Sequence, residues 1–321
     1  MMKFGLSGSS GGLESLQDDR LLTMIPQLEK WGYSSVWINE EHFQRNRSCF
    51  SPLILGATFA ALSSSLRVGF SALITPLHHP LRLAEEIASM DRLSGGRVDF
   101  GVSRGHPGHY FDSYQIDASQ RTELFRNGVS EILDYWTKGI VRVGDNELDF
   151  SPMPIQTPHP PIYVAAYSDD SVKWAAEAGH HLILHGIQSI ESLSRCLHVF
   201  KESGGHTPSI PVGRFVYVGE SDQQARDDIW PTVCQLTSRL KKIRTDRFSL
   251  INSEDDLEPE LFFEQLAIIG GPETCARKIK QLNEEFGIQH VNLLSSFFGI
   301  LPARLLEESL ERFSKEVMPK L

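Results

Sequence analysis

A serine, an arginine and a glycine follow a strand-like stretch in the first third of the chain. From Val98 to Val102 apolar side chains alternate with other residues, which is the period of a β-strand, and Ser103, Arg104 and Gly105 come next. A hydroxyl, a guanidinium fork and a flexible backbone at a strand end can hold a phosphate group. A surface arginine after an ordinary strand is the alternative, so the interpretation depends on the rest of the chain.

A second set of hydroxyl groups begins a predicted helix. Ser168 and Ser171 flank Asp169 and Asp170 directly after a predicted strand. Two hydroxyls at a helix N-terminus can form an anion site, although the same residues also make an ordinary N-cap whose acids complement the helix dipole. Because the two aspartates would repel a phosphate, an anion site requires that both carboxylates point away from it.

Two carboxylates and an imidazole follow another predicted strand. Glu40, Glu41 and His42 combine groups that donate and accept protons, so they could perform general acid–base chemistry. The alternative is a surface ion-pair cluster with Arg45 and Arg47.

Histidine pairs elsewhere do not predict a metal site. His78-His79 and His180-His181 are adjacent in sequence, and adjacent side chains of a strand point to opposite faces. Neither these pairs nor His106 and His109 have acidic ligands at matching spacing. We therefore expect no bound metal.

Strands and helices alternate along the chain, which indicates an α/β fold. The expected strands are Lys3–Ser7, Ser35–Asn39, Leu66–Leu73, Val98–Val102, Ile162–Ala166, Leu182–Leu184, Ile210–Val218 and His290–Leu294. Eight such strands, each followed by a helix, predict a (β/α)8 TIM barrel. A doubly wound sheet is the alternative, but no G-x-G-x-x-G follows a strand, and Gly8-Ser9-Ser10-Gly11-Gly12 has the wrong spacing.

Helical spacing and end signals predict the helices between these strands. They are expected at 18–31, 52–64, 80–93, 119–138, 169–178, up to about 201, from 222 onward, from 271 to 286, and at 302–317. Pro26 inside the first of them predicts a kink or a later start. Two short runs at 141–150 predict an inserted hairpin, and the polar, aperiodic residues 239–260 predict a long insertion before the last strand that could act as a mobile lid.

The C-terminal ends of barrel strands meet on one face, which is where barrel enzymes place their chemistry. Functional groups follow five of the predicted strands: Asn39 to His42, Ser71-Ala72, Ser103 to Gly105, Tyr167-Ser168 and His185. The phosphate-holding groups and the acid–base groups are therefore expected at one mouth.

Length and charge restrict the kind of protein. The 321 residues are 40% hydrophobic and carry a formal net charge of −10. Such a chain can bury a large core, and we expect a single barrel domain over residues 1–321. An acidic chain without basic runs argues against nucleic acid and anionic membranes, so local groups must hold any anionic ligand.

Cysteine spacing and the N-terminus favour a cytoplasmic protein. The four cysteines lie far apart without a C-x-x-C pair, which fits a reducing compartment. A strand-like stretch follows Met1-Met2-Lys3 directly, so we expect no signal peptide, and the longest apolar run, Leu53 to Leu62, is too short to span a bilayer.

Several stretches, in order along nearly the whole chain, resemble one family. They are Val36-Trp37-Ile38-Asn39-Glu40-Glu41-His42-Phe43, Leu66 to Ala72 with Pro76 and His79-Pro80, Asp91-Arg92-Leu93-Ser94-Gly95-Gly96-Arg97 through Gly105, Pro160 to Ala166 with Ser168 and Ser171, and Leu310 to Leu321. Together they resemble the bacterial luciferase-like family of flavin monooxygenases, whose fold is a (β/α)8 barrel.

The resemblance implies a cofactor and the residues that bind it. The family's usual cofactor is reduced FMN, and one branch uses the deazaflavin F420. By position, Arg104, Ser168 and Ser171 would hold the flavin phosphate, with Gly105 and Tyr167 in the same cofactor-binding set. Ser71 and Ala72 would lie against the isoalloxazine ring, joined by a non-proline cis peptide, and Ser103 would lie near its reactive edge.

The resemblance also implies chemistry and partners. Reduced FMN from a separate reductase would react with dioxygen at C4a, and the peroxide would oxidise a small organic substrate. Luciferases have Glu-His-His where this chain has Glu40-Glu41-His42, so Glu41 replaces the histidine tied to light emission. Family members pair through helices two and three, and the apolar surplus at 53–62 agrees with a homodimer. The alternatives are an F420-dependent oxidoreductase and a non-catalytic flavin-binding relative.

Overall fold

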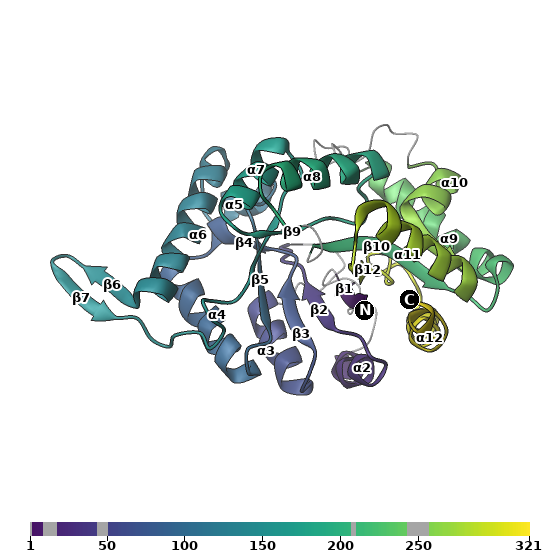
Figure 1. Cartoon of the computed structure of the whole chain (residues 1–321), viewed down its shortest axis with the longest axis horizontal. Coiled ribbons are helices and arrows are strands. Elements are labelled where there is room, and N and C mark those ends of the chain that lie inside the picture. The colour runs from purple at the N-terminus through teal and green to yellow at the C-terminus, as the bar shows by residue number, and fades with distance from the viewer. Residues whose placement is uncertain (1, 9–17, 44–50, 207–209, 243–256) are drawn as a thin grey trace.

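Parallel strands form the centre of the molecule and helices lie outside them (Figure 1). The computed structural model describes residues 2–8, 18–43, 51–206, 210–242 and 257–321. The strands of the main sheet are β1 Lys3–Gly8, β2 Ser35–Ile38, β3 Arg67–Phe70, β4 Leu73–Ile74, β5 Val98–Ser103, β8 Ile162–Ala165, β9 His181–Ile183, β10 Pro211–Val218, β11 Ala267–Gly270 and β12 His290–Leu293.

The sheet curls until β9 comes next to β10. Its order is β11-β10-β12-β1-β2-β3-β5-β8-β9, all in parallel. A parallel bridge between Leu184, just after β9, and Val212 of β10 links the last strand back to the first part of the sheet. The protein is therefore an α/β protein with a (β/α)8 barrel, as the alternation of strands and helices predicted.

Helices connect the strands, and the longer of them cover the outer face of the sheet (Figure 1). They are α2 Asp18–Lys30, α3 Pro52–Leu62, α4 Pro80–Ser94, α5 His109–Ser113, α6 Arg121–Lys138, α7 Asp169–Glu177, α8 Ile190–Glu202, α9 Asp222–Lys242, α10 Pro259–Leu261, α11 Pro272–Phe286 and α12 Ala303–Arg312. The predicted hairpin is confirmed: β6 Ile140–Val143 pairs antiparallel with β7 Asn146–Asp149, and it projects from the body of the molecule (Figure 1).

The two faces of the strands can be told apart by their contacts. Trp37 of β2 meets Tyr163 of β8, with ring centroids 5.2 Å apart, although these strands are not neighbours in the sheet. Only side chains inside a barrel can meet in this way, so Trp37 points inward. A side chain at Gly5 would collide with Trp37, with Ser35 and with Asn292, so these residues share the interior. Strand residues that alternate with these inward-facing positions point toward the helices.

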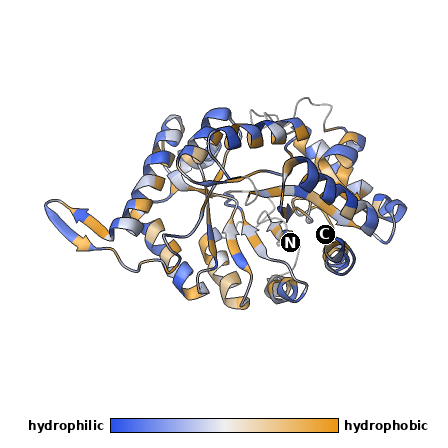
Figure 2. Cartoon of the chain, in the orientation of Figure 1, coloured by the Kyte–Doolittle hydropathy of each residue, from blue (hydrophilic) through white to orange (hydrophobic). Residues whose placement is uncertain are grey.

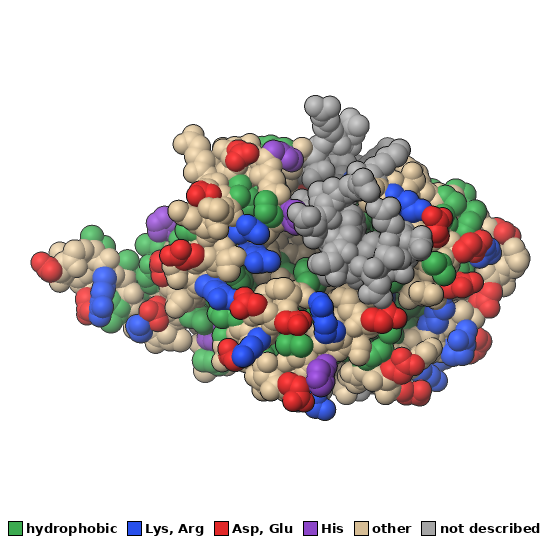
Figure 3. Space-filling model, turned by 90° about the horizontal axis from the view of Figure 1, so that it is seen from above, with side chains coloured by type: hydrophobic (Ala, Val, Ile, Leu, Met, Phe, Trp, Pro, Cys, Tyr) green, Lys and Arg blue, Asp and Glu red, His purple; other side chains and the backbone are tan. Residues whose placement is uncertain are grey.

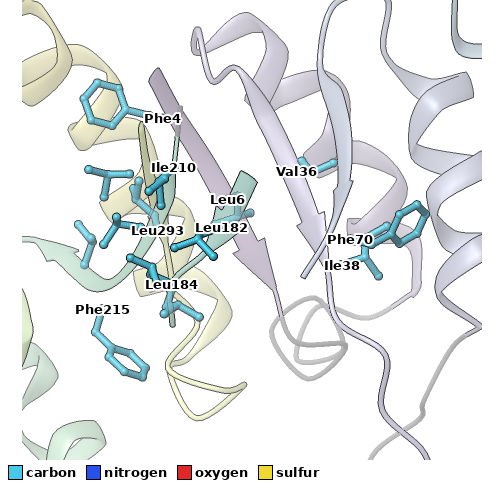
Figure 4. Packing of buried hydrophobic residues seen from close by; sticks show 14 of the residues in the cluster. Phe4, Leu6, Val36, Ile38, Phe70, Leu182, Leu184, Ile210, Phe215 and Leu293 are labelled. Carbon is cyan, nitrogen blue, oxygen red and sulfur yellow. The ribbon is translucent and has the colours of Figure 1, made fainter. Parts of the chain in front are cut away.

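The outward strand residues build the main hydrophobic core. Buried apolar residues of this layer include Phe4, Leu6, Val36, Ile38, Phe70, Leu182, Leu184 and Leu293 (Figure 4). Apolar residues cluster on the strands and on the helix sides that face them, while the outer helix surfaces are more polar (Figure 2). The helices are thus held to the barrel mainly by apolar burial.

The structure corrects four predicted details. The third strand is not continuous from Leu66 to Leu73, because β3 ends at Phe70 and the short β4 starts at Leu73. Helix α2 begins at Asp18 and contains Pro26, so the predicted later start of this helix was wrong. The insertion at 239–260 is shorter, since α9 runs to Lys242 and α10 begins at Pro259, and residues 243–256 lie outside the described part. Strand β11, which pairs with β10, was not predicted.

Candidate active site

The end of β5 lies beside the starts of two helices. Arg104 follows β5 and donates from Nη1 to the hydroxyl of Thr122 in α6, 3.2 Å away. Because β8 is the neighbour of β5, α7, which follows β8, begins next to it. Burial lowers the pKa of Arg104, the positive charges of Arg121 and Arg126 lower it further, and Asp170 acts in the opposite direction. Three guanidinium groups therefore gather near the start of α7.

The acids at the start of α7 are neutralised by arginines. Asp170 pairs with Arg126, with 2.7 Å between oxygen and nitrogen, and Asp169 pairs with Arg195 at 3.4 Å. Both carboxylates therefore have cationic partners, which reduces the repulsion that an anion at this helix end would otherwise meet.

The hydroxyls of α7 form an N-cap. Ser168 accepts the backbone amide of Ser171, and the two hydroxyl oxygens lie 2.8 Å apart. The alternative interpretation of these serines, an ordinary helix N-cap, is thus confirmed. A cap and an anion site are compatible, because the other amides of the first turn still point out of the helix.

Arg121 offers a donor that nothing in the described structure uses. Its Nη1 donates to the carbonyl of Ala118 at 2.8 Å, whereas its Nε is buried without a hydrogen-bond partner. A buried donor without an acceptor is costly, and an external anion would satisfy it. The residues around Arg104 therefore fit the phosphate of a flavin mononucleotide.

The strand ends beside Arg104 carry the other predicted cofactor residues. The Ser71–Ala72 peptide bond is cis, as predicted. The Ser71 hydroxyl donates to Asn39 Oδ1 at 2.7 Å, and the Ser103 hydroxyl donates to the carbonyl of Leu73 at 3.2 Å. Ser103 Oγ also lies 3.3 Å from the amide nitrogen of Gly105, which has a left-handed φ of +70°.

Ala72 and Tyr167 are apolar parts of this region. Ala72 is half-buried and packs against the interior cluster of Trp37, Tyr163 and Ile183. Tyr167 is half-buried and packs against the main core, while its carbonyl accepts hydrogen bonds from α8. Burial raises the pKa of the Tyr167 phenol, so that it stays protonated.

Glu40 is the centre of a buried hydrogen-bond network. Its carboxylate accepts from His42 Nε2 at 3.0 Å, from His78 Nε2 at 2.9 Å, and from the amide of Ile74 at 2.5 Å. Burial raises the pKa of Glu40, but the hydrogen bonds from His42 and His78 outweigh burial and bring it to about 2. For His78, burial lowers the pKa, and the bond and charge of Glu40 outweigh it, so its pKa is raised.

This network corrects the surface-cluster alternative for Glu40. The Glu40 side chain is only 2% exposed and pairs with histidines, and Arg45 and Arg47 lie outside the described residues. Glu41, the next residue, is half-buried. A buried, ionised carboxylate between two imidazoles can hold a proton on a neighbouring ring at the barrel mouth.

Aromatic rings surround the open side of His42. The hydroxyl of Tyr114 lies 3.4 Å from His42 Nδ1, and the rings of Phe43, Tyr110 and Tyr114 lie within contact of the imidazole. Phe43 is 57% exposed, so this aromatic group is open to the outside in the described structure.

Sequence reasoning missed several of these residues. The His78-His79 pair suggests only a metal ligand from its sequence, although His78 follows the third strand and so belongs to the same barrel mouth. Arg121 and Arg126 lie in the first turns of α6, which follows β5 and the short α5, and their spacing of five residues forms no recognisable motif. His185, the fifth predicted strand end, is half-buried, and burial together with the charge of Arg214 lowers its pKa to about 4.

Two other classes of site are absent from the described residues. No group of three or more metal-binding side chains occurs among them. Within the same residues, no helix has both the length and the apolar character needed to cross a bilayer.

Comparison with known proteins identifies the family. A model of the luciferase-like monooxygenases matches residues 3–290, so the chain belongs to this family. The alkanal monooxygenase alpha chain of the Kryptophanaron alfredi symbiont is 29% identical over 192 residues, 57% of this chain and 53% of that one. The oxygenase component of the flavin-dependent trigonelline monooxygenase of Acinetobacter baylyi is 26% identical over 223 residues, 65% of this chain and 61% of that one. The chain thus spans between half and two thirds of the length of these curated relatives.

Solved structures agree on the fold. The oxygenating constituent of 3,6-diketocamphane monooxygenase from Pseudomonas putida, a type II Baeyer-Villiger monooxygenase in complex with FMN, superposes with a TM-score of 0.82 at 19% identity, covering 100% of this chain and 99% of that one. The coenzyme F420-dependent tetrahydromethanopterin reductase of Methanopyrus kandleri has a TM-score of 0.72 at 18% identity, covering 99% of each chain.

Proposed function

We propose that this protein is the oxygenase component of a two-component system, which uses FMNH2 and dioxygen to oxidise a small organic substrate. The observation that supports it best is the group of arginines around Arg104, with the unpartnered Nε of Arg121 and with Asp170 already paired. A phosphate carries nearly two negative charges and must bind to a protein of net charge −10, so it needs local cations of this kind.

In this proposal the chain holds the flavin at three places. Arg104, Ser168 and Ser171 bind the phosphate, with Arg121 as a further donor. Ser71 and Ala72 lie against the ring, and Ser103 lies near its reactive edge. The reduced flavin supplies the electrons that activate dioxygen, while the barrel excludes water from the reaction.

The Glu40 network then controls protons beside the flavin. Glu40 is ionised at neutral pH, because its pKa is about 2, and it favours the protonated form of His78. His42 bridges the buried carboxylate and the exposed Tyr114, so it can carry a proton between the interior and the mouth. Glu41 lies next to this pair and completes the proposed catalytic group.

The proposal includes partners and a place of action. A separate reductase supplies FMNH2, and the protein acts in the cytoplasm as one barrel domain. A homodimer through α3 and α4 is supported by Ile54, which is 71% exposed on α3, and by Leu93, which is 86% exposed on α4. Single exposed apolar residues are common, but two on adjacent helices favour an interface.

Anaerobic titration with FMN, reduced FMN and F420 tests the cofactor. We expect reduced FMN to bind more tightly than F420, and the reverse order would favour an F420-dependent oxidoreductase. Isotopically labelled dioxygen, supplied with FMNH2 and a panel of ketones, aldehydes and aromatic compounds, tests the reaction. Label in a product supports an oxygenase, whereas flavin binding without label in any product would indicate a flavin-binding protein.

A further inference from the structure

A buried arginine lies on the outer face of the barrel, away from the flavin site. Arg214 of β10 follows Gly213, which pairs with Asn292 of β12, a residue of the interior. Because strand side chains alternate between faces, Arg214 points outward into the helix layer. In the sheet, β8 and β9 separate β10 from β5, the strand that ends at Arg104.

Arg214 has no counter-ion in the described structure. The residue is 2% exposed, and its Nη1 donates only to the carbonyl of Gly213, at 3.0 Å. Its Nη2 is buried with no hydrogen-bond partner, and no described carboxylate pairs with it. Burial lowers the pKa of Arg214 to about 10, so the group is still charged at neutral pH. A buried cation with neither ion pair nor full hydrogen bonding is costly to keep.

A cavity of about 490 Å³ opens beside this arginine. It is bounded by Arg214, by the start of α8 at Ser189 and Ile190, and by residues of β11 and α11. The volume falls in the range of small-molecule sites. The first turn of α8, a helix of 13 residues, adds the positive end of a helix dipole to the charge of Arg214.

The other charged side chains of the cavity are two cations and three carboxylates, one of them Glu191 in the first turn of α8, so they add no net attraction for an anion. Arg277 and Lys278 line it together with Glu191, Glu264 and Glu285. Lys278 donates to backbone carbonyls, that of Ala267 among them at 3.0 Å, so it is already engaged. The attraction for an anion therefore comes from Arg214 and from the start of α8 rather than from the rim.

We propose that the cavity between α8 and α11 binds a small oxyanion, the phosphate or carboxylate group of a small molecule, with Arg214 as its counter-ion. The unpartnered Nη2 and the start of α8 supply the hydrogen-bond donors. This site is separate from the flavin phosphate site, so the cavity would take a second ligand.

Calorimetric titration tests this proposal in the full chain. Inorganic phosphate would also bind at Arg104, so the titration is done in the Arg104→Ala variant at matched ionic strength. A phosphate monoester and acetate, titrated in the same way, separate a phosphate site from a carboxylate site. We expect at least one of the three to bind saturably with a Kd of roughly 1 mM or tighter.

Variants of Arg214 decide whether the cavity is the site. In the Arg104→Ala background, Arg214→Met should weaken the bound oxyanion at least about tenfold, and Arg214→Lys should weaken it less. Methionine removes an unpaired buried charge, so the Arg214→Met variant should fold with unchanged or higher Tm. If it does not fold, the weaker binding expected of Arg214→Lys is the test. Arg142→Met, at an exposed arginine of the β6–β7 hairpin outside the cavity, is the control and should change binding little.

Three results would overturn the proposal. They are no saturable binding of any of the three anions in the Arg104→Ala protein, equal binding with Arg214 and with its replacements, or loss of binding on Arg142→Met. FMN binding by the Arg214→Met chain is measured in parallel. It should be unchanged, so failure here and failure of the proposed flavin site can be told apart.

Discussion

Replacing Glu40 by glutamine tests the strongest electrostatic feature of the site. The glutamine keeps the shape of the side chain and loses the charge that His42 and His78 contact. In the folded protein the pKa of Glu40 is about 2, against an ordinary value of 4.5. At about 1.4 kcal/mol per pKa unit, this difference corresponds to about 3 kcal/mol of folding stability.

The sign of the pH dependence follows from the direction of each shift. The pKa of Glu40 is depressed on folding, so its contribution is present above pH 4.5 and is lost as the pH falls toward about 2. The pKa of His78 is raised, so its contribution is present in full below pH 6.5 and is lost as the pH rises through the raised value. Both pKa shifts include the same contact between Glu40 and His78, so their contributions to stability are not added.

Urea unfolding of the two proteins measures the effect. At about pH 6, where both groups are charged, Glu40→Gln should lower the free energy of unfolding by about 3 kcal/mol. At about pH 3 the difference in the free energy of unfolding should be smaller, because the wild-type protein has by then lost part of the stability that ionised Glu40 contributes. The exposed Glu284→Gln is the control and should stay within about 0.5 kcal/mol of wild type. A difference below about 1 kcal/mol at pH 6, or one that does not change with pH, would refute the reasoning.

Three further predictions concern the flavin, the protons and the subunits. Arg104→Ala should weaken FMN binding about ten- to a hundredfold in a fluorescence titration and leave riboflavin binding unaffected, whereas Arg142→Ala on the exposed hairpin should change neither. Equal weakening of FMN and riboflavin binding would show that Arg104 does not bind the phosphate. His42→Ala should lower product yield while oxygen uptake continues as peroxide release, and unchanged coupling in both His42→Ala and Glu41→Gln would assign this group no part in the reaction. Light scattering should give twice the chain mass of 36.1 kDa for wild type and a monomer for Ile54→Glu, and a wild-type monomer at micromolar concentration would rule out a stable dimer.

Local patterns were sufficient for most of the fold. Alternation of apolar residues and the helix end signals depend only on near neighbours, which is why the strands of the barrel and the hairpin were found. The missed β11, Ala267–Gly270, is only four residues long and gains its place by pairing with β10. Such a short strand has little local signal, because its stability comes from a distant partner.

The position of the candidate site could be predicted from the sequence, but its charge pairing could not. The sequence by itself determined which groups lie at strand ends, and hence that Arg104, Ser168 and Glu40 belong to one mouth of the barrel. Only the tertiary structure decided how their charges are balanced. Asp170 is neutralised by Arg126, which is 44 residues away in the chain, and Glu40 is held by His78, 38 residues away. Charge pairing depends on distance in space and on burial, and neither can be read from spacing along the chain.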